Sequence, residues 1–129
     1  MPQNLPRPTD AELGILSVIW MLGPSTVRSI HEEMIKHQPK LGYTTVLKLL
    51  QIMTEKGLVE RDESQRAHVY SPRESEESTQ QQLVSDLATR AFGGSATQLV
   101  MQALSGRKAS TTELAEIREM LDALEGGSK

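Results

Sequence analysis

The chain has 129 residues and a net charge of −3, and 37% of its residues are hydrophobic but only 3% are aromatic. This length suits one compact domain with an extension, whose small aliphatic core would be completed by pairing with a second copy. Because the chain has no cysteine, disulfides, thiolate metal sites and a cysteine nucleophile are excluded.

The N-terminal residues 1–9 are polar and include three prolines, without the apolar run of a secretory signal. No apolar run in the chain approaches the length that spans a bilayer. We therefore expect a cytoplasmic protein that does not insert into a membrane.

A first helix is predicted to begin at Thr9, because Thr9 and Glu12 have the spacing of a capping box. The Gly-Pro pair at 23–24 stops this helix. Ser25 or Thr26 can cap a second helix, which has to end before the proline at position 39.

A third helix is predicted from about Tyr43 to Lys56, with Gly57 as the residue that ends it. Its apolar side chains recur every three or four residues, so one face is expected to be buried. The opposite face is polar and able to form hydrogen bonds, with Thr44, Thr45, Lys48, Gln51 and Glu55.

Two short strands are predicted next, at 58–61 and 67–70, with a polar turn between them and Pro72 after them. A hairpin alone is marginal in water, but one that directly follows a helix-turn-helix is typical of a wing. Residues 1–72 are therefore predicted to form a winged helix-turn-helix domain.

The remainder is predicted to be helical, with helices at 75–92, after Ser95 and after Ser110, and with a disordered tail at 126–129. Because these helices have narrow apolar faces, we interpret residues 73–125 as a helical dimerisation domain, the alternative being that they fold back on the N-terminal domain. The fold class is mainly α with a small sheet (α+β). The residues predicted at the dimer contact are Leu83, Leu87, Leu99, Leu114, Ile117, Leu121 and Leu124.

The charge is unevenly distributed. Residues 1–72 contain eight Lys or Arg and eight Asp or Glu, whereas residues 73–129 contain six and nine. A neutral domain can still bind phosphate if its cations gather on one face, so the charge neither supports nor excludes DNA binding.

The order and spacing of several short motifs resemble the penicillinase repressor family, the BlaI/MecI/CopY-type regulators. The matching stretches are the Thr-Asp-Ala-Glu-Leu start at 9–13, Ile-Trp-x-x-Gly-Pro at 19–24, Leu-Gly-Tyr-Thr-Thr-Val-Leu at 41–47, Glu-Lys-Gly-Leu-Val at 55–59, Phe-Gly-Gly-Ser at 92–95 and the last helix at 113–124. The resemblance covers nearly the whole chain. It implies a homodimer that sits on a palindromic operator in double-stranded DNA and blocks transcription.

In the family's best-known members, repression ends when the repressor is cleaved between its halves after a membrane sensor-protease detects a β-lactam, which would make this chain a regulator of antibiotic resistance. Three residues or groups depart from the pattern. The chain lacks the cysteine cluster of the copper-responsive branch, so copper sensing is not expected. The Asn-Phe cleavage bond corresponds here to Gln102-Ala103, and Ile52 stands where many members have arginine, so both the cleavage and the operator sequence can differ.

The third helix is the predicted reader of base edges, because an α-helix fits the major groove and Thr44, Thr45, Lys48 and Gln51 can exchange hydrogen bonds there. Phosphate contacts are predicted for the cations around it and on the wing. These are Arg28, Lys40, Arg61 and Arg66.

Other functions were weighed against this interpretation. The histidines at 31, 37 and 68 lack the spacing of metal ligands, and no cofactor or metal is expected. No phosphate-binding glycine loop or nucleophile elbow occurs, so the chain is not expected to be an enzyme. The alternative from another class is a winged helix that binds only protein, which the salt dependence of binding would distinguish from DNA binding.

Overall fold

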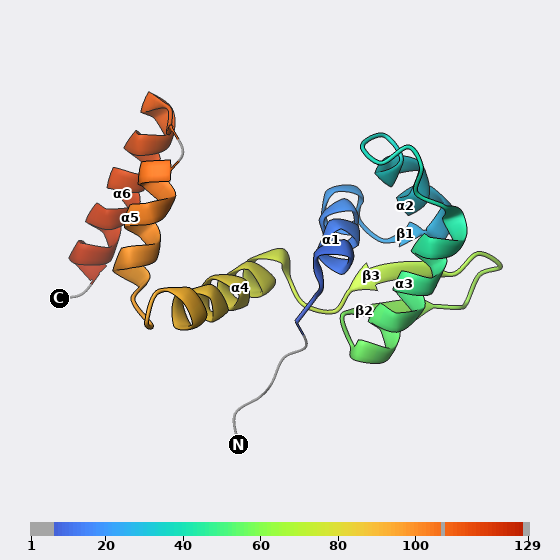
Figure 1. Cartoon of the computed structure of the whole chain (residues 1–129). Coiled ribbons are helices and arrows are strands. Elements are labelled where there is room, and N and C mark those ends of the chain that lie inside the picture. The colour runs from blue at the N-terminus through green and yellow to red at the C-terminus, as the bar shows by residue number, and fades with distance from the viewer. Residues whose placement is uncertain (1–6, 107, 128–129) are drawn as a thin grey trace, which may run out of the picture. The chain divides into compact units, whose positions relative to one another are not determined.

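The computed structural model describes residues 7–106 and 108–127, which form six helices and one three-stranded antiparallel sheet (Figure 1). This confirms the predicted fold class, mainly helical with a small sheet. In chain order the elements are α1 (Asp10–Leu22), β1 (Ser25–Thr26), α2 (Val27–Met34), α3 (Tyr43–Lys56), β2 (Val59–Asp62), β3 (Val69–Pro72), α4 (Glu76–Ala91), α5 (Ala96–Gly106) and α6 (Thr111–Gly127).

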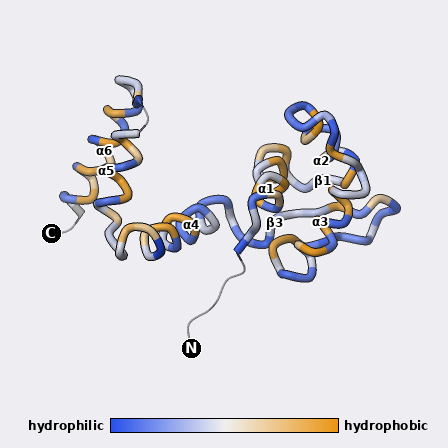
Figure 2. Tube along the Cα trace, in the orientation of Figure 1, coloured by the Kyte–Doolittle hydropathy of each residue, from blue (hydrophilic) through white to orange (hydrophobic). Residues whose placement is uncertain are grey.

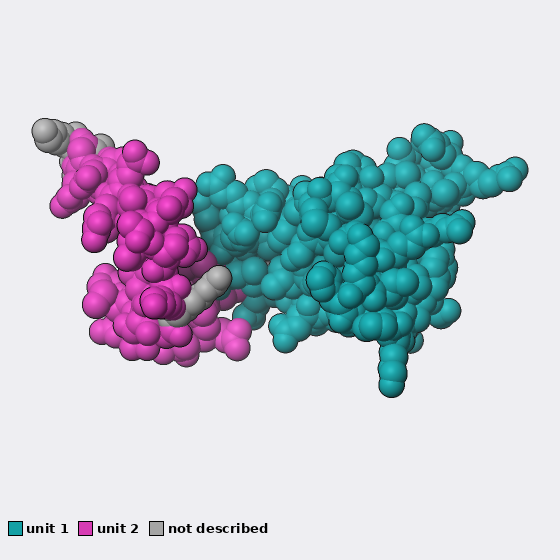
Figure 3. All heavy atoms as spheres, turned by 90° about the horizontal axis from the view of Figure 1, so that it is seen from above, with its two compact units in different colours: residues 1–83 teal, residues 84–129 magenta. Residues whose placement is uncertain are grey.

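The chain divides into two compact units, residues 1–83 (unit 1) and residues 84–129 (unit 2), coloured teal and magenta in Figure 3. The division falls inside α4. The predicted functional boundary lies earlier, between residues 72 and 73, and it stays a prediction about which residues bind DNA and which dimerise.

In unit 1, α2 packs against both α1 and α3, and the sheet closes the core beside them. The buried side chains are almost all aliphatic, as the scarcity of aromatic residues predicted. The fully buried ones are Ile15, Ile19, Ile30, Val46, Leu50, Met53, Val59 and Tyr70. This core holds α3 by one face and leaves the other face outside.

The predicted capping box of α1 is confirmed. The Glu12 N–H donates to the Thr9 hydroxyl over 3.2 Å, and the Thr9 N–H donates to Glu12 Oε1 over 2.9 Å. Gly23 ends the helix with φ of 86°, a backbone conformation that glycine adopts without strain.

The sheet has the order β1-β3-β2. The strands β2 and β3 begin one and two residues later than predicted, and β3 includes Pro72, which was expected to end the hairpin. Pro72 stands opposite Val59 at the end of the ladder, where its missing N–H costs no bond inside the sheet. The two-residue strand β1, paired with β3, was not predicted because two residues show no periodicity.

In unit 2, the turn after α4 contains Gly93 and Gly94, whose φ angles are 57° and 86°, and the Gly94 N–H donates to the Ala88 carbonyl over 2.8 Å. The predicted capping box at Ser110 and Glu113 is confirmed by both of its hydrogen bonds. Helix α6 spans Thr111–Gly127 and so includes the first two residues of the tail predicted at 126–129, whose last two lie outside the described residues.

Candidate nucleic-acid interface

Helix α3 has one buried face and one exposed polar face. Val46, Leu50 and Met53 are fully buried against the core. The predicted base-reading side chains all lie on the exposed side: Thr44, Thr45, Lys48 and Gln51. The structure therefore places all four on the exposed side of α3, opposite its buried face.

The start of α3 differs from the starts of α1 and α2. Thr9 and Thr26 cap those helices through their hydroxyl groups, whereas the N-cap residue of α3 is Gly42, which has no side chain to offer. The first N–H groups of α3 therefore have no side-chain acceptor at the cap. The positive end of the helix dipole adds to this donor character.

His31 and Tyr43 support the start of α3 and were not predicted as part of the site. His31 Nε2, on α2, lies 2.8 Å from the carbonyl oxygen of Leu41 in the connection that precedes α3. Its ring also meets the Tyr43 ring edge-on, with ring centres 5.8 Å apart. The sequence shows only a histidine beside two glutamates, because the contact joins residues that are ten positions apart.

Ile52 lies at the margin of the exposed face, with 36% of its surface accessible. Tyr43, at the first position of α3, is 47% exposed. The position at which the family pattern has arginine is thus open to an incoming partner, and an apolar side chain occupies it.

The predicted phosphate-binding cations are in different states. Arg28 pairs with Glu32 over 3.5 Å along α2, and both side chains are well exposed. Lys40 and Arg66 are exposed, in the connection before α3 and in the hairpin loop. Within residues 7–106 and 108–127, Lys40, Lys48 and Arg66 have no carboxylate at ion-pair distance.

Arg61 is held by two neighbours in the hairpin. It stands opposite Tyr70 in the sheet register, and its guanidinium pairs with Glu63 over 2.6 Å. Hydrogen bonds to Tyr70 and Glu63, with the charge of Glu63, raise the pKa of Arg61 above its usual value. Its charge is therefore secure, but its Nε and Nη2 donors are already directed at the carboxylate of Glu63.

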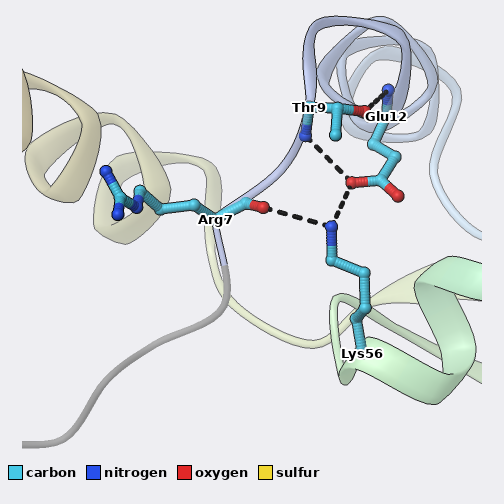
Figure 4. Close-up of polar contacts among 4 residues, drawn as sticks. All are labelled: Arg7, Thr9, Glu12 and Lys56. Carbon is cyan, nitrogen blue, oxygen red and sulfur yellow. Dashed lines mark hydrogen bonds and ion pairs between the residues drawn. The ribbon is translucent and has the colours of Figure 1, made fainter.

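A half-buried ion pair joins the end of α3 to the start of α1 (Figure 4). Lys56 Nζ lies 2.7 Å from Glu12 Oε1, and Glu12 is only 2% exposed. Lys56 also donates to the backbone carbonyl of Arg7 over 3.3 Å. The C-terminal end of α3 is thus fixed by charge, while its start is fixed by the His31 contact.

The predicted dimer residues belong to helices α4, α5 and α6, along which polar and apolar residues alternate in Figure 2. Leu87, Leu121 and Leu124 are 48%, 55% and 60% exposed in the single chain. The other four are half-buried: Leu83, Leu99, Leu114 and Ile117. The predicted cleavage residues, Gln102 and Ala103, are both exposed inside α5.

No group of three or more His, Asp or Glu side chains that could hold a metal ion occurs in the part of the chain that the structure describes. None of the helices formed by the described residues has the length and apolar character needed to cross a membrane.

Three comparisons place these features beside known proteins. Residues 8–123 match the model of the penicillinase repressor family. The transcriptional regulator BlaI of Mycobacterium tuberculosis, strains CDC 1551 / Oshkosh and ATCC 25618 / H37Rv, is 37% identical over 70 residues, which are 54% of this chain and 50% of the relative. The chain thus spans about half the length of these curated relatives.

A solved structure also matches. The solution structure of the DNA-binding domain of the repressor BlaI superposes with a TM-score of 0.50 at 25% identity, over 58% of this chain and 90% of that domain. The superposed part, 58% of this chain, is about as long as the winged helix-turn-helix domain predicted at residues 1–72.

Proposed function

The chain belongs to the penicillinase repressor family, and from this premise we propose that it represses transcription as a homodimer bound to a palindromic operator in double-stranded DNA. The family and the likeness to the DNA-binding domain of BlaI support a DNA-binding transcriptional repressor rather than an enzyme. The observation that carries the proposal is the polar face of α3, which is exposed opposite a buried apolar face.

In this proposal the exposed face of α3 contacts base edges. Thr44 and Thr45 lie in its first turn, and Lys48 follows one turn later. Threonine hydroxyls can donate to or accept from a base, and a lysine ammonium can reach a guanine edge or a phosphate. The cations outside α3 would contact phosphates, which orient the protein without reading sequence.

The homodimer is supported by the exposed apolar side chains of α4, α5 and α6. A large apolar side chain that moves from water into an interface contributes roughly 1.5–3 kcal/mol. Leu87, Leu121 and Leu124 are about half exposed in one copy, so a second copy would bury them. A twofold pair would bring two α3 helices to one palindrome.

Release by proteolysis is a further part of the proposal. The Gln102-Ala103 bond lies within the 11-residue helix α5. Because proteases bind their substrates in extended form, cutting there would require α5 to open locally. A membrane sensor-protease is the partner that the family resemblance suggests for this step.

Titration of operator and random duplexes, followed by fluorescence anisotropy, tests the proposal. Lys48→Ala is expected to lower operator affinity by about 1–3 kcal/mol and to relax base preference, because it removes a base contact. Arg66→Ala is expected to weaken binding to all sequences alike and to reduce the salt slope by about 1.

Lys108→Ala is the matched control, because it removes the same charge from unit 2. If the parent binds no sequence more tightly than random duplex, the proposed function is wrong. If Lys48→Ala and Arg66→Ala both bind like the parent, the assignment of the contact residues is wrong.

A further inference from the structure

The hairpin between β2 and β3 carries a counter-ion for one of its own candidate phosphate contacts. Arg61 Nε lies 2.7 Å and Arg61 Nη2 lies 2.6 Å from the same carboxylate oxygen, Oε2 of Glu63. Two donors of one guanidinium thus converge on one anion. A DNA phosphate would be bound through donors of the same kind.

The local chain geometry holds this pair together. Arg61 and Glu63 are two residues apart, and in extended chain such residues point to the same side. Asp62 between them accepts the Ser64 N–H over 2.9 Å, which fixes the turn just after β2. On the other strand Tyr70, 1% exposed, stands opposite Arg61 and limits where its side chain can go.

The composition of the hairpin also indicates that it binds phosphate weakly. From Val59 to Pro72 it contains three acids, Glu60, Asp62 and Glu63, but only two arginines, Arg61 and Arg66. Such a segment attracts a phosphate backbone weakly. Of the two arginines, Arg61 is paired, whereas Arg66 has no carboxylate at ion-pair distance among the described residues.

We propose that Glu63 competes with DNA phosphate for Arg61 and thereby limits the sequence-independent part of the chain's DNA affinity. This inference rests on the proposed DNA-binding function. The wing then adds little to binding while Arg61 remains on Glu63, and discrimination between sequences is left to α3. Glu63 is thus a determinant of affinity that contacts no base.

Glu63→Gln tests this, because glutamine keeps the size of the side chain and removes its charge. Binding is expected to tighten by about 1.4- to fivefold, the range that corresponds to the energies of exposed ion pairs. The gain should be equal on operator and on random duplex, because a phosphate contact carries no sequence information. The slope of log K against log salt should steepen by about 0.9, since one more phosphate is neutralised.

Two controls distinguish the release of Arg61 from the general effect of removing a negative charge from the hairpin. Glu60→Gln removes the same charge from β2 in the same hairpin, where the carboxylate does not pair with Arg61, and should tighten binding less and leave the salt slope unchanged. In the Arg61→Gln background, Glu63→Gln should add no more than Glu60→Gln does. The amide and Nε–H signals of the hairpin in ¹⁵N-labelled protein report whether each variant keeps the fold.

The outcomes are distinct. A gain in DNA affinity that is larger for Glu63→Gln than for Glu60→Gln, and that requires Arg61, supports the inference. Equal gains from Glu60→Gln and Glu63→Gln, or a gain that persists without Arg61, overturn it and leave the DNA-binding function intact. Failure of every variant, the parent included, to bind any duplex overturns the proposed function and the inference with it.

Discussion

Glu12 is buried, yet its charge is stabilised. Burial would raise the pKa of Glu12, but hydrogen bonds from Lys56 and Thr9 and the charge of Lys56 outweigh it, so the pKa lies below the usual 4.5. A carboxylate whose pKa is lower in the folded state contributes stability that is fully present above the unfolded value. That contribution should be lost as the pH falls below 4.5 and through the folded pKa of Glu12.

Lys56→Met should lower the free energy of unfolding at pH 7 by about 3 kcal/mol, because it leaves a buried carboxylate without its counter-ion. Glu12→Gln should cost only about 1 kcal/mol, since glutamine can still cap α1 and Lys56 can reach water. Urea denaturation at pH 7 and pH 4 measures both.

In Lys56→Met the pKa of Glu12 should rise, so this variant should lose less stability on acidification than the parent. Equal costs for the two substitutions at pH 7 would contradict this.

His31 should set the position of α3 through its contact with the Leu41 carbonyl. His31→Gln can still donate a hydrogen bond, whereas His31→Leu keeps bulk and removes the donor. We expect His31→Leu to weaken operator binding by about 1 kcal/mol, the contribution of one hydrogen bond, and His31→Gln to restore much of it. Anisotropy with operator and single-base variants is the measurement. If both variants bind like the parent, His31 has no positioning role.

The sequence was informative about side chains whose contacts are local. The capping pairs at Thr9 and Ser110 were predicted because both partners lie within one helical turn. The polar face of α3 was predicted because helical periodicity separates it from the core. His31 with Leu41, and Lys56 with Glu12, join residues brought together only by folding, and no local pattern indicates them.

The apolar side of helix α6 allows a direct test of the proposed dimer. Leu121→Asp places a charge on the seam of Leu114, Ile117, Leu121 and Leu124, so it should yield monomers by light scattering. Ala115→Asp adds the same charge to the same helix on its other side, at an exposed position, and should leave the dimer intact. A monomeric parent at micromolar concentration would show that the dimer proposal is wrong.

The helices were more predictable than the strands. Each helix carries several periodic apolar residues and a cap or a glycine at an end, so its bounds are specified more than once. The strands β2 and β3 have four residues each, and their register depends on which residues the core buries. Val59 and Tyr70 are buried, and they place the strands later than hydrophobicity alone indicated.

For the whole molecule, a twofold dimer would require half-sites spaced by about 10–10.5 bp or a multiple, so that both α3 helices meet the same side of the duplex. Insertion of about 5 bp between the half-sites turns one by half a helical turn and should weaken binding strongly. Insertion of about 10 bp should restore part of it. Affinity that does not change with either insertion would count against simultaneous binding by two copies.

Whether two copies assemble is the feature that the sequence predicted least. Periodicity shows that α4, α5 and α6 have apolar faces, but a narrow apolar face can rest on its own chain or on another. The exposure of Leu121 and Leu124 in the single chain favours a second copy, although the sequence alone left both arrangements open.

Ionic strength is expected to affect pairing of two copies and DNA binding in opposite directions. Helix α5 has no charged residue, and α6 has five acidic residues and one arginine, so two copies brought together would repel each other through α6. Added salt screens that repulsion, while it weakens contacts between cations and phosphates. Concentrated electrolyte should therefore strip the protein from DNA as intact pairs, and dilute buffer should hold it on DNA while loosening the pairs themselves.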